Sequence, residues 1–286
     1  MNNRFPQQKF GKKGFPLLIT LAGFPDDCTS GWGVENLETL SKEYRVVSLC
    51  LPGYDKPGRK IRSWGWDTHE VMAILHFTIE EILAEEKADG FNFMVHDWGA
   101  FYGMCYQNAH PEHIKKMIIF DIGVVKKPPT GDALRIVFYQ IWFAVAFFIT
   151  QLPPSAFFRW IGDLCMVLYN LLFSWTPICP TNEQLPRGIL NVTALQCYPY
   201  YYFWLGPSGF IRLGPKKMLR PRTPDCPTLF FYGKKKNLMF HSEDFLTQIR
   251  NREDSSVVTM PNSGHWMMTT REDSEVVIKE ILAFVE

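Results

Sequence analysis

One short stretch joins an apolar run, a turn and a carboxylate in an order that could do chemistry. It comprises residues 91–100 (FNFMVHDWGA). It matches the nucleophile elbow, small-x-nucleophile-x-Gly, in which a tight strand-to-helix turn lifts one side chain above a sheet. Gly99 and Ala100 supply the small residues that the turn needs, whereas Val95 is larger than the glycine usual at its position. The spacing therefore predicts Asp97 as the nucleophile.

An aspartate nucleophile implies a particular mechanism. A carboxylate is ordinarily ionised at neutral pH, so it needs no base to activate it. It can attack an sp3 carbon and form an alkyl ester on the enzyme. Hydrolysis of that ester needs a general base for the water and two N–H donors for the oxyanion that develops on Asp97. The base and the donors must come from elsewhere in the chain.

One histidine is well placed to be this base. His265 lies in residues 257–266 (VVTMPNSGHW), in a loop directly after the last expected strand. His96 is next to Asp97, but successive side chains on a strand point to opposite faces. The other histidines are interpreted as surface, packing or helix-end residues: His69, His76, His110, His113 and His241.

Backbone amides can supply the two oxyanion donors. One belongs to Trp98, the residue that follows the nucleophile. The other should follow the first buried strand, where residues 21–26 read LAGFPD, and we expect Phe24 to provide it. Taken alone, Gly-Phe-Pro-Asp signals only a turn. The elbow elsewhere in the chain gives that turn a functional interpretation.

The elements that must position these residues alternate between strand and helix. Apolar runs predict strands at residues 15–23, 44–51, 91–95, 116–120, 228–232 and 256–260. Helical patterns predict helices at residues 35–42, 67–87, 98–108, 242–250 and 272–284. Such alternation predicts an α/β fold with a mostly parallel central sheet and helices on both faces. The core would comprise residues 1–124 and 226–286.

A helical, aromatic insert at residues 125–225 interrupts this alternation. It follows the strand that ends near Asp121, so it should cover the carboxyl ends of the strands, where α/β sheets bind ligands. Within it, residues 136–150 (IVFYQIWFAVAFFIT) are nearly all apolar. As a helix they would span about 22 Å, short of the roughly 30 Å hydrocarbon core of a bilayer. We therefore expect a buried or pocket-lining helix, with membrane contact as the less favoured alternative.

Composition narrows the classes of partner. The 286 residues carry a formal net charge of +1 and no basic patch interleaved with aromatics, which argues against nucleic acid. Short basic runs such as Lys234–Lys236 are interpreted as solvated surface. Seven cysteines without a Cys-x-x-Cys pair, and a polar N-terminus without an apolar signal segment, indicate a cytoplasmic protein. No cofactor or metal is predicted, and the oligomeric state is left open.

Four segments resemble the epoxide hydrolases and haloalkane dehalogenases, the α/β-hydrolase-fold enzymes with an aspartate nucleophile. They are residues 23–25 (GFP), 51–54 (LPGY), 96–99 (HDWG) and 263–265 (SGH). The resemblance spans nearly the whole chain and is weakest over the insert, which corresponds to that family's helical cap. Ala22 stands where the family usually has histidine, so the amide of Phe24 would keep its role in different surroundings.

The resemblance also directs the choice of triad acid. The family commonly carries it a few residues after a Tyr-Gly pair, but here Tyr232-Gly233 leads into Lys234–Lys236. A lysine there would destabilise an imidazolium on His265. Some dehalogenases carry the acid after the strand that follows the elbow, and Asp121 fills that position in this chain. Asp121 is therefore the predicted acid.

Residues of the insert decide which reaction the resemblance implies. Epoxide hydrolases use two cap tyrosines to hydrogen-bond the epoxide oxygen. Tyr139 and Tyr200 fit the early and late positions, with Tyr201 close behind. Dehalogenases instead need N–H donors for a halide, for which Trp98 and Trp142 are the candidates. The favoured function is opening of a hydrophobic epoxide to a diol. The alternatives are carbon–halogen hydrolysis and a non-catalytic ligand-binding protein of the same fold.

Overall fold

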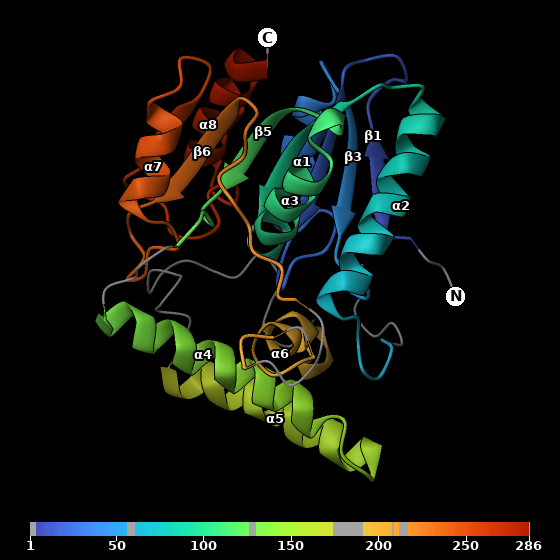
Figure 1. Cartoon of the computed structure of the whole chain (residues 1–286), viewed down its shortest axis with the longest axis vertical. Coiled ribbons are helices and arrows are strands. Elements are labelled where there is room, and N and C mark those ends of the chain that lie inside the picture. Colours follow the sequence, from blue (N-terminus) through green and yellow to red (C-terminus); the bar gives the residue numbers. More distant parts are fainter. Residues whose placement is uncertain are drawn as a thin grey trace.

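The computed structural model describes residues 4–55, 61–125, 130–173, 191–207, 209–211 and 217–285. The seven strands in these residues form one sheet in the order β1-β3-β2-β4-β5-β6-β7 (Figure 1). They are β1 (Gln7–Phe10), β2 (Leu17–Ala22), β3 (Arg45–Cys50), β4 (Phe91–His96), β5 (Ile114–Phe120), β6 (Thr228–Gly233) and β7 (Ser256–Met260). Every pairing is parallel except that of β1, which runs antiparallel to β3. The sequence did not predict β1, because its four residues (QQKF) contain no apolar run.

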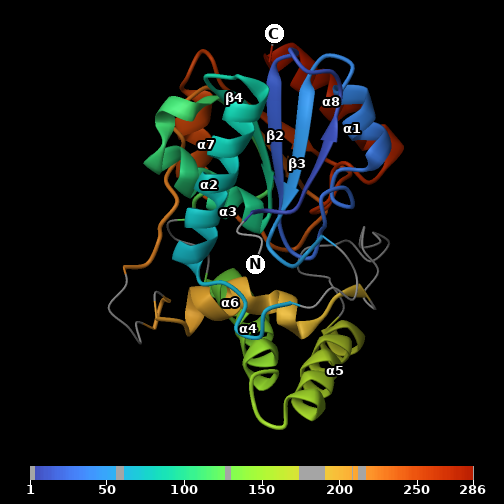
Figure 2. The same cartoon turned by 90° about the vertical axis from the view of Figure 1, so that its right-hand side faces the viewer.

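Helices cover both faces of the sheet (Figure 2). Side chains alternate along a strand, so neighbouring residues of β2 enter different cores. Ile19 belongs to the core that also contains residues of α2 (Thr68–Glu86), α3 (Trp98–Ala109) and α7 (Glu243–Arg250). Leu18 belongs to the core that contains residues of α1 (Val34–Leu40) and α8 (Arg271–Val285). The predicted α/β class, with a mostly parallel sheet between two helical layers, is confirmed.

A helical region is inserted between β5 and β6, and we call it the insert. It contains α4 (Thr130–Ile149), α5 (Ser155–Phe173), the 3-10 helix Ala194–Cys197 and α6 (Tyr198–Trp204). Helix α4 packs against both α5 and α6. In Figure 1 these helices lie beyond the ends of the strands, with α6 nearer to the sheet than α5. Asp97 and Asp121 directly follow β4 and β5, so the insert covers the carboxyl edge where both carboxylates lie.

Helix α4 is longer than the sequence suggested. Its 20 residues begin at Thr130 rather than at Ile136 and correspond to about 30 Å of helix. Among the described helices, only this one is long and apolar enough to cross a membrane by length and composition, and 28% of its apolar window is buried. The argument from a span of about 22 Å was therefore wrong, because it placed the start of the helix too late. One side of α4 is buried as expected, but much of the rest is exposed.

Candidate active site

The turn between β4 and α3 holds Asp97 in a backbone conformation that few non-glycine residues adopt. Its φ is 54° and its ψ is −127°, which is typical of a strained functional turn. A Cβ on Gly99 would lie 2.1 Å from the carbonyl oxygen of Leu21, so only glycine fits there. A Cβ on Gly103 would lie 2.7 Å from Cγ1 of Val95, so Gly103 makes room for the larger residue before the apex.

The loop after β2 brings one amide to the Asp97 carboxylate. The backbone N–H of Phe24 donates to Asp97 Oδ1 at 2.7 Å. Gly23 permits this approach, because a Cβ there would lie 2.4 Å from Asp97 Oδ1 and 2.3 Å from the amide nitrogen of Trp98. The amide of Trp98 is thus on the same side as the carboxylate, at the first turn of α3. The loop and the helix N-terminus form an anion-binding pocket of the kind that stabilises an oxyanion.

Two further side chains complete a buried chain of proton-transfer groups. His265 Nε2 lies 3.4 Å from Asp97 Oδ2, and His265 Nδ1 lies 2.5 Å from Asp121 Oδ2. Asp121, at the end of β5, has a φ of 67° and an amide that donates to the carbonyl of Phe231 on β6. His265 and Asp121 are both buried. The three residues predicted from separate parts of the sequence therefore meet in the order Asp97 carboxylate, His265 imidazole, Asp121 carboxylate.

Lys236 is part of this arrangement, which corrects its interpretation as solvated surface. Its Nζ forms an ion pair with Asp121 Oδ1, and both side chains have no exposed area. Lys234 and Lys235 remain exposed, so only the third lysine turns inward. Its ammonium also lies 5.8 Å from the ring centroid of Phe240. Asp121 thus bridges two cationic groups, the ammonium through Oδ1 and the imidazole through Oδ2.

These contacts set the protonation states of the buried groups. Burial opposes ionisation of Asp121, but Lys236 and His265 together hold its pKa well below the usual range. Burial likewise opposes a charged His265, but its contacts with Asp121 and Asp97 raise its pKa to about 9. At neutral pH the imidazole is consequently protonated between two carboxylates. It can act as a base only after one of those negative charges has been removed.

A cavity of about 750 Å³ lies between the Asp97 carboxylate and the insert. Asp97, Tyr139 and Tyr200 all line it, among mostly apolar side chains that include Trp98 and Phe240. The Tyr200 ring packs edge-on against Trp98, with centroids 5.0 Å apart, and lies 6.3 Å from the Tyr139 ring. Burial raises the pKa of both phenols, so they keep their protons. The site can place an apolar molecule between a carboxylate and two phenolic donors.

Comparison with known proteins agrees with this geometry. Residues 16–271 match the α/β hydrolase fold family. This chain belongs to the α/β-hydrolase fold family. The human protein named epoxide hydrolase 4 is 30% identical over 99% of this chain and 76% of its own length. The chain is thus a distant relative of the epoxide hydrolases.

Solved structures show the same fold in this family. Epoxide hydrolase from Bacillus megaterium, in complex with an inhibitor, matches 98% of this chain and 96% of its own with a TM-score of 0.61 at 18% identity. An esterase from a marine microorganism matches 98% of this chain and 99% of its own with a TM-score of 0.58 at 19% identity. Since an esterase matches as well as an epoxide hydrolase, the choice of reaction depends on the site residues.

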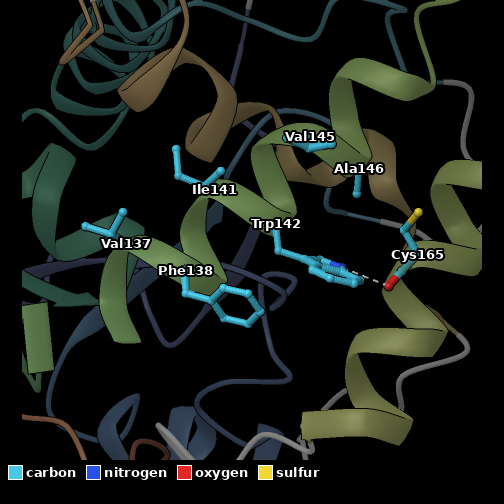
Figure 3. A pocket seen from close by; sticks show the side chains of 7 residues that line it. All are labelled: Val137, Phe138, Ile141, Trp142, Val145, Ala146 and Cys165. Atoms are coloured by element: carbon cyan, nitrogen blue, oxygen red, sulfur yellow. Dashed lines mark hydrogen bonds between the residues drawn. The ribbon is translucent and has the colours of Figure 1, made fainter. Parts of the chain in front are cut away.

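The structure corrects one predicted site residue of this α/β hydrolase. Trp142 does not line the cavity that contains Asp97, and its Nε1 donates to the carbonyl of Cys165 on α5 at 3.0 Å (Figure 3). The indole lines a second cavity, on the other side of α4. Trp142 is therefore unavailable as a donor to a leaving group. Tyr201, the alternative to Tyr200, packs against Phe147 and Phe148 instead of lining the catalytic cavity.

Sequence reasoning also missed a buried carboxyl behind the hydrolase site. Asp26, in the loop of the oxyanion amide, accepts hydrogen bonds from Trp266 Nε1 at 2.7 Å and Ser30 Oγ at 3.0 Å. Burial raises the pKa of Asp26 to about 7, although both donors oppose the shift. Trp266 follows the base, so this contact ties the oxyanion loop to the loop of His265. In the sequence, Asp26 is only the last residue of the turn signal Gly-Phe-Pro-Asp.

His96 lies behind the imidazole of His265. Its Nε2 is 3.1 Å from the carbonyl oxygen of His265, and the two rings are 4.3 Å apart. Burial lowers the pKa of His96 to about 3, so the ring is neutral. It cannot reach the cavity, because strand alternation turns it away from Asp97, as the sequence predicted.

Proposed function

We propose that this α/β hydrolase opens hydrophobic epoxides to diols through an alkyl ester on Asp97. The observation that carries the proposal is the shared apolar cavity, lined at once by the elbow carboxylate and by the phenols of Tyr139 and Tyr200. A carboxylate and phenolic acids on one cavity suit an epoxide, which needs a nucleophile at carbon and a proton at oxygen.

The first half-reaction follows from the two oxygens of Asp97. Oδ1 accepts the hydrogen bond from Phe24, which leaves Oδ2 as the more nucleophilic atom. Oδ2 attacks an epoxide carbon, the carbon–oxygen bond of the ring breaks, and the departing oxygen takes a proton from Tyr200 or Tyr139. A phenol can protonate an alkoxide because the alkoxide is far more basic. The product is an ester of Asp97 that carries a neighbouring hydroxyl, and the phenolate regains its proton from water.

The second half-reaction uses His265 as the base. Its Nε2 removes a proton from water, and the hydroxide oxygen attacks the carboxyl carbon of Asp97. The negative charge of the tetrahedral intermediate develops on Oδ1, where the amide of Phe24 already lies within 2.7 Å. Collapse breaks the ester bond, the alkoxide takes the proton from His265, and the diol leaves. The Asp97 carboxyl then gives its proton to His265 Nε2, which lies 3.4 Å from Oδ2, and the starting carboxylate and imidazolium are restored.

Esterification itself prepares the base. In the free enzyme, Asp97 and Asp121 both favour the protonated imidazole, and together they raise the pKa of His265 to about 9. The ester carries no charge, so only Asp121 still supports the cation. The pKa of His265 therefore falls once the first step is complete, and the imidazole can lose its proton when a base is required.

The geometry favours an epoxide over a haloalkane. Halide release needs N–H donors in the cavity, and the indole of Trp142 is committed to Cys165 on the far side of α4. Of the two candidate donors to a halide, only Trp98 lines the cavity that contains Asp97. The phenols, by contrast, suit a strongly basic leaving oxygen rather than a halide, which needs no proton.

The test compares turnover of styrene oxide with halide release from 1-chlorobutane and 1-bromobutane. We expect diol formation by the wild type and none by Asp97→Ala. His265→Gln should accumulate the ester, which appears as the mass of the substrate added to the peptide that contains Asp97. Halide release without diol formation would identify a dehalogenase. Full activity of Asp97→Ala would eliminate the covalent mechanism, and binding of styrene oxide without any turnover would favour a ligand-binding protein.

A further inference from the structure

The outer surface of the insert carries two apolar stripes. On α4, the stripe comprises Leu134, Phe138, Ile141, Val145 and Phe148, and on α5 it comprises Phe157, Trp160, Leu164, Leu168 and Leu171. Spacings of three and four residues place each set on one face of its helix. All ten are exposed except Ile141, which is half-buried. Of the 19 large hydrophobic residues that are exposed in the described part of the chain, 11 lie on these two helices.

These stripes are separate from the face that covers the active site. Tyr139, Phe143 and Phe147 occupy the opposite side of α4 and are buried. Helix α4 is therefore apolar around most of its circumference, while 28% of its apolar window is buried. A helix that is apolar all round normally lies in a protein core or in lipid. Because one side of α4 packs against α6, lipid could reach only its outer side.

The outer face also contains a hollow that suits an alkyl chain. A cavity of about 360 Å³ is lined by Val137, Phe138, Ile141, Trp142, Val145, Ala146 and Cys165. Figure 3 shows most of these side chains along α4, with Trp142 reaching across to the backbone of α5. Val137 lines this hollow and also the catalytic cavity, so the outer face adjoins the substrate space.

The distribution of charge indicates which partner covers this face. No Asp, Glu, Lys or Arg occurs from residue 136 to 158 or from residue 164 to 173. Interfaces between proteins carry a polar rim and regular hydrogen bonds, for which these stripes offer no charged groups. Charged side chains occur instead near the start of α4, where Arg135 is exposed, and off the stripe of α5, where Arg159 and Asp163 are half-buried. An apolar face that bears an exposed tryptophan and adjoins the exposed Arg135 matches hydrocarbon flanked by anionic headgroups.

We propose that the outer face of α4 and α5 docks on a phospholipid bilayer, with the two stripes in the acyl-chain region and the catalytic lobe in water. The sequence leaves membrane contact as the less favoured alternative, and the proposal adopts it because the apolar run both lines the cavity that contains Asp97 and faces outward. The proposal goes beyond the proposed reaction and does not depend on it, because binding to lipid requires no turnover.

The test is flotation of the full chain with vesicles of phosphatidylcholine, with and without phosphatidylserine. The informative variant is Phe148→Glu/Trp160→Glu, which places one carboxylate on each stripe. Its matched control is Phe77→Glu/Val276→Glu on α2 and α8, where the side chains are 49% and 46% exposed, against 42% and 61% for Phe148 and Trp160. We expect the wild type and the control to float, and the variant to partition about a hundredfold less well.

Each outcome has a defined meaning. Equal flotation of the wild type and the variant would place the contact elsewhere and overturn the proposal. A wild type that stays with the soluble fraction would also overturn it. If that soluble wild type is a dimer in sedimentation equilibrium and the variant is a monomer, the face is an interface between two copies instead. Flotation of Asp97→Ala like the wild type would keep the proposal standing even if the proposed reaction failed.

Discussion

Replacement of Asp121 by asparagine separates the structural and catalytic roles of the buried carboxylate. In the wild type Asp121 accepts from Lys236 through one oxygen and from His265 through the other, and none of these side chains is appreciably exposed. Asp121→Asn keeps the size of the side chain but removes its charge. The buried Lys236 ammonium then loses the charge of Asp121, and His265 Nδ1 faces an amide that need not hold the same tautomer.

The size of both effects follows from this burial. Breaking a buried ion pair by removing one partner costs about 3–5 kcal/mol of folding free energy. For a chain of this size, each kcal/mol corresponds to roughly 2–4 °C, so the midpoint of thermal unfolding should fall by about 6–20 °C. Loss of the carboxylate behind the base should slow hydrolysis of the Asp97 ester about 100- to 10,000-fold. Formation of the ester should be slowed much less, because it does not use His265 as a base.

A second variant distinguishes the two roles. Asp121→Asn/Lys236→Met also removes the ammonium that has lost the charge of Asp121 and fills its place with an apolar side chain, so stability should return to near the wild-type value. Hydrolysis of the ester should remain slow. Thermal unfolding by circular dichroism measures the first quantity, and single-turnover mass spectrometry of the Asp97 peptide measures the second. If Asp121→Asn were as stable and as active as the wild type, both parts of the reasoning would be refuted. A fast double variant would refute the catalytic part alone.

Two further predictions concern the cavity and its pH dependence. Tyr200→Phe should reduce the rate of ester formation on an epoxide about 100-fold or more, with little change in its hydrolysis, as followed by single-turnover kinetics. Asp97→Asn should lower the pKa of His265 from about 9, because one of its two supporting carboxylates is lost, as read from the ring-proton shifts in an NMR titration. The raised pKa stabilises the fold fully below the ordinary value of 6.5, and that contribution is lost as pH rises through about 9. In the variant the pKa of the folded state is closer to 6.5. Urea unfolding should therefore show that the free energy of unfolding falls over a narrower range of pH. An unchanged His265 titration in Asp97→Asn would contradict the assigned contact.

Local sequence patterns predicted the structure correctly where one segment determines its own conformation. The helix at residues 67–87 begins where predicted, because the Asp67 side chain accepts from the backbone of His69 and Glu70. The Glu70 side chain in turn accepts from the backbone of Asp67, so both ends of the capping box lie within four residues. The elbow was equally local, since its tight turn, its apex and its small residues are consecutive.

The buried position of Lys236 could not be predicted from a local sequence pattern. A run of three lysines has no period that distinguishes an inward from an outward side chain. What turns Lys236 inward is the pairing of β5 with β6, in which Phe120 lies opposite Phe231. Residues just beyond the two strands therefore meet, and a buried carboxylate at the end of β5 needs a cation from the loop after β6. The pairing of two strands separated by the insert was the missing information.

Helix α4 shows a second limit of reading the sequence. Periodicity gives the phase of a helix only when one face is apolar and the other polar. Around α4 both faces are apolar, so the sequence could not tell that Tyr139 lines the cavity that contains Asp97 while the Trp142 indole donates to α5. The assignment of Trp142 failed for this reason. The same ambiguity hid the outer stripe, which is visible only once the buried side has been identified.

The ion pair with Lys236 has a consequence for the timing of catalysis. The carboxylate of Asp121 supports the imidazolium of His265, and it continues to do so after esterification. Lys236 neutralises part of the charge of Asp121 through the oxygen that does not face the ring. Asp121 still contributes more than Asp97 to the raised pKa of His265, but Lys236 reduces the difference, and the contribution of Asp97 disappears when the ester forms. A lysine at the position where the family commonly has its acid thus makes the protonation state of the base more sensitive to whether Asp97 is esterified.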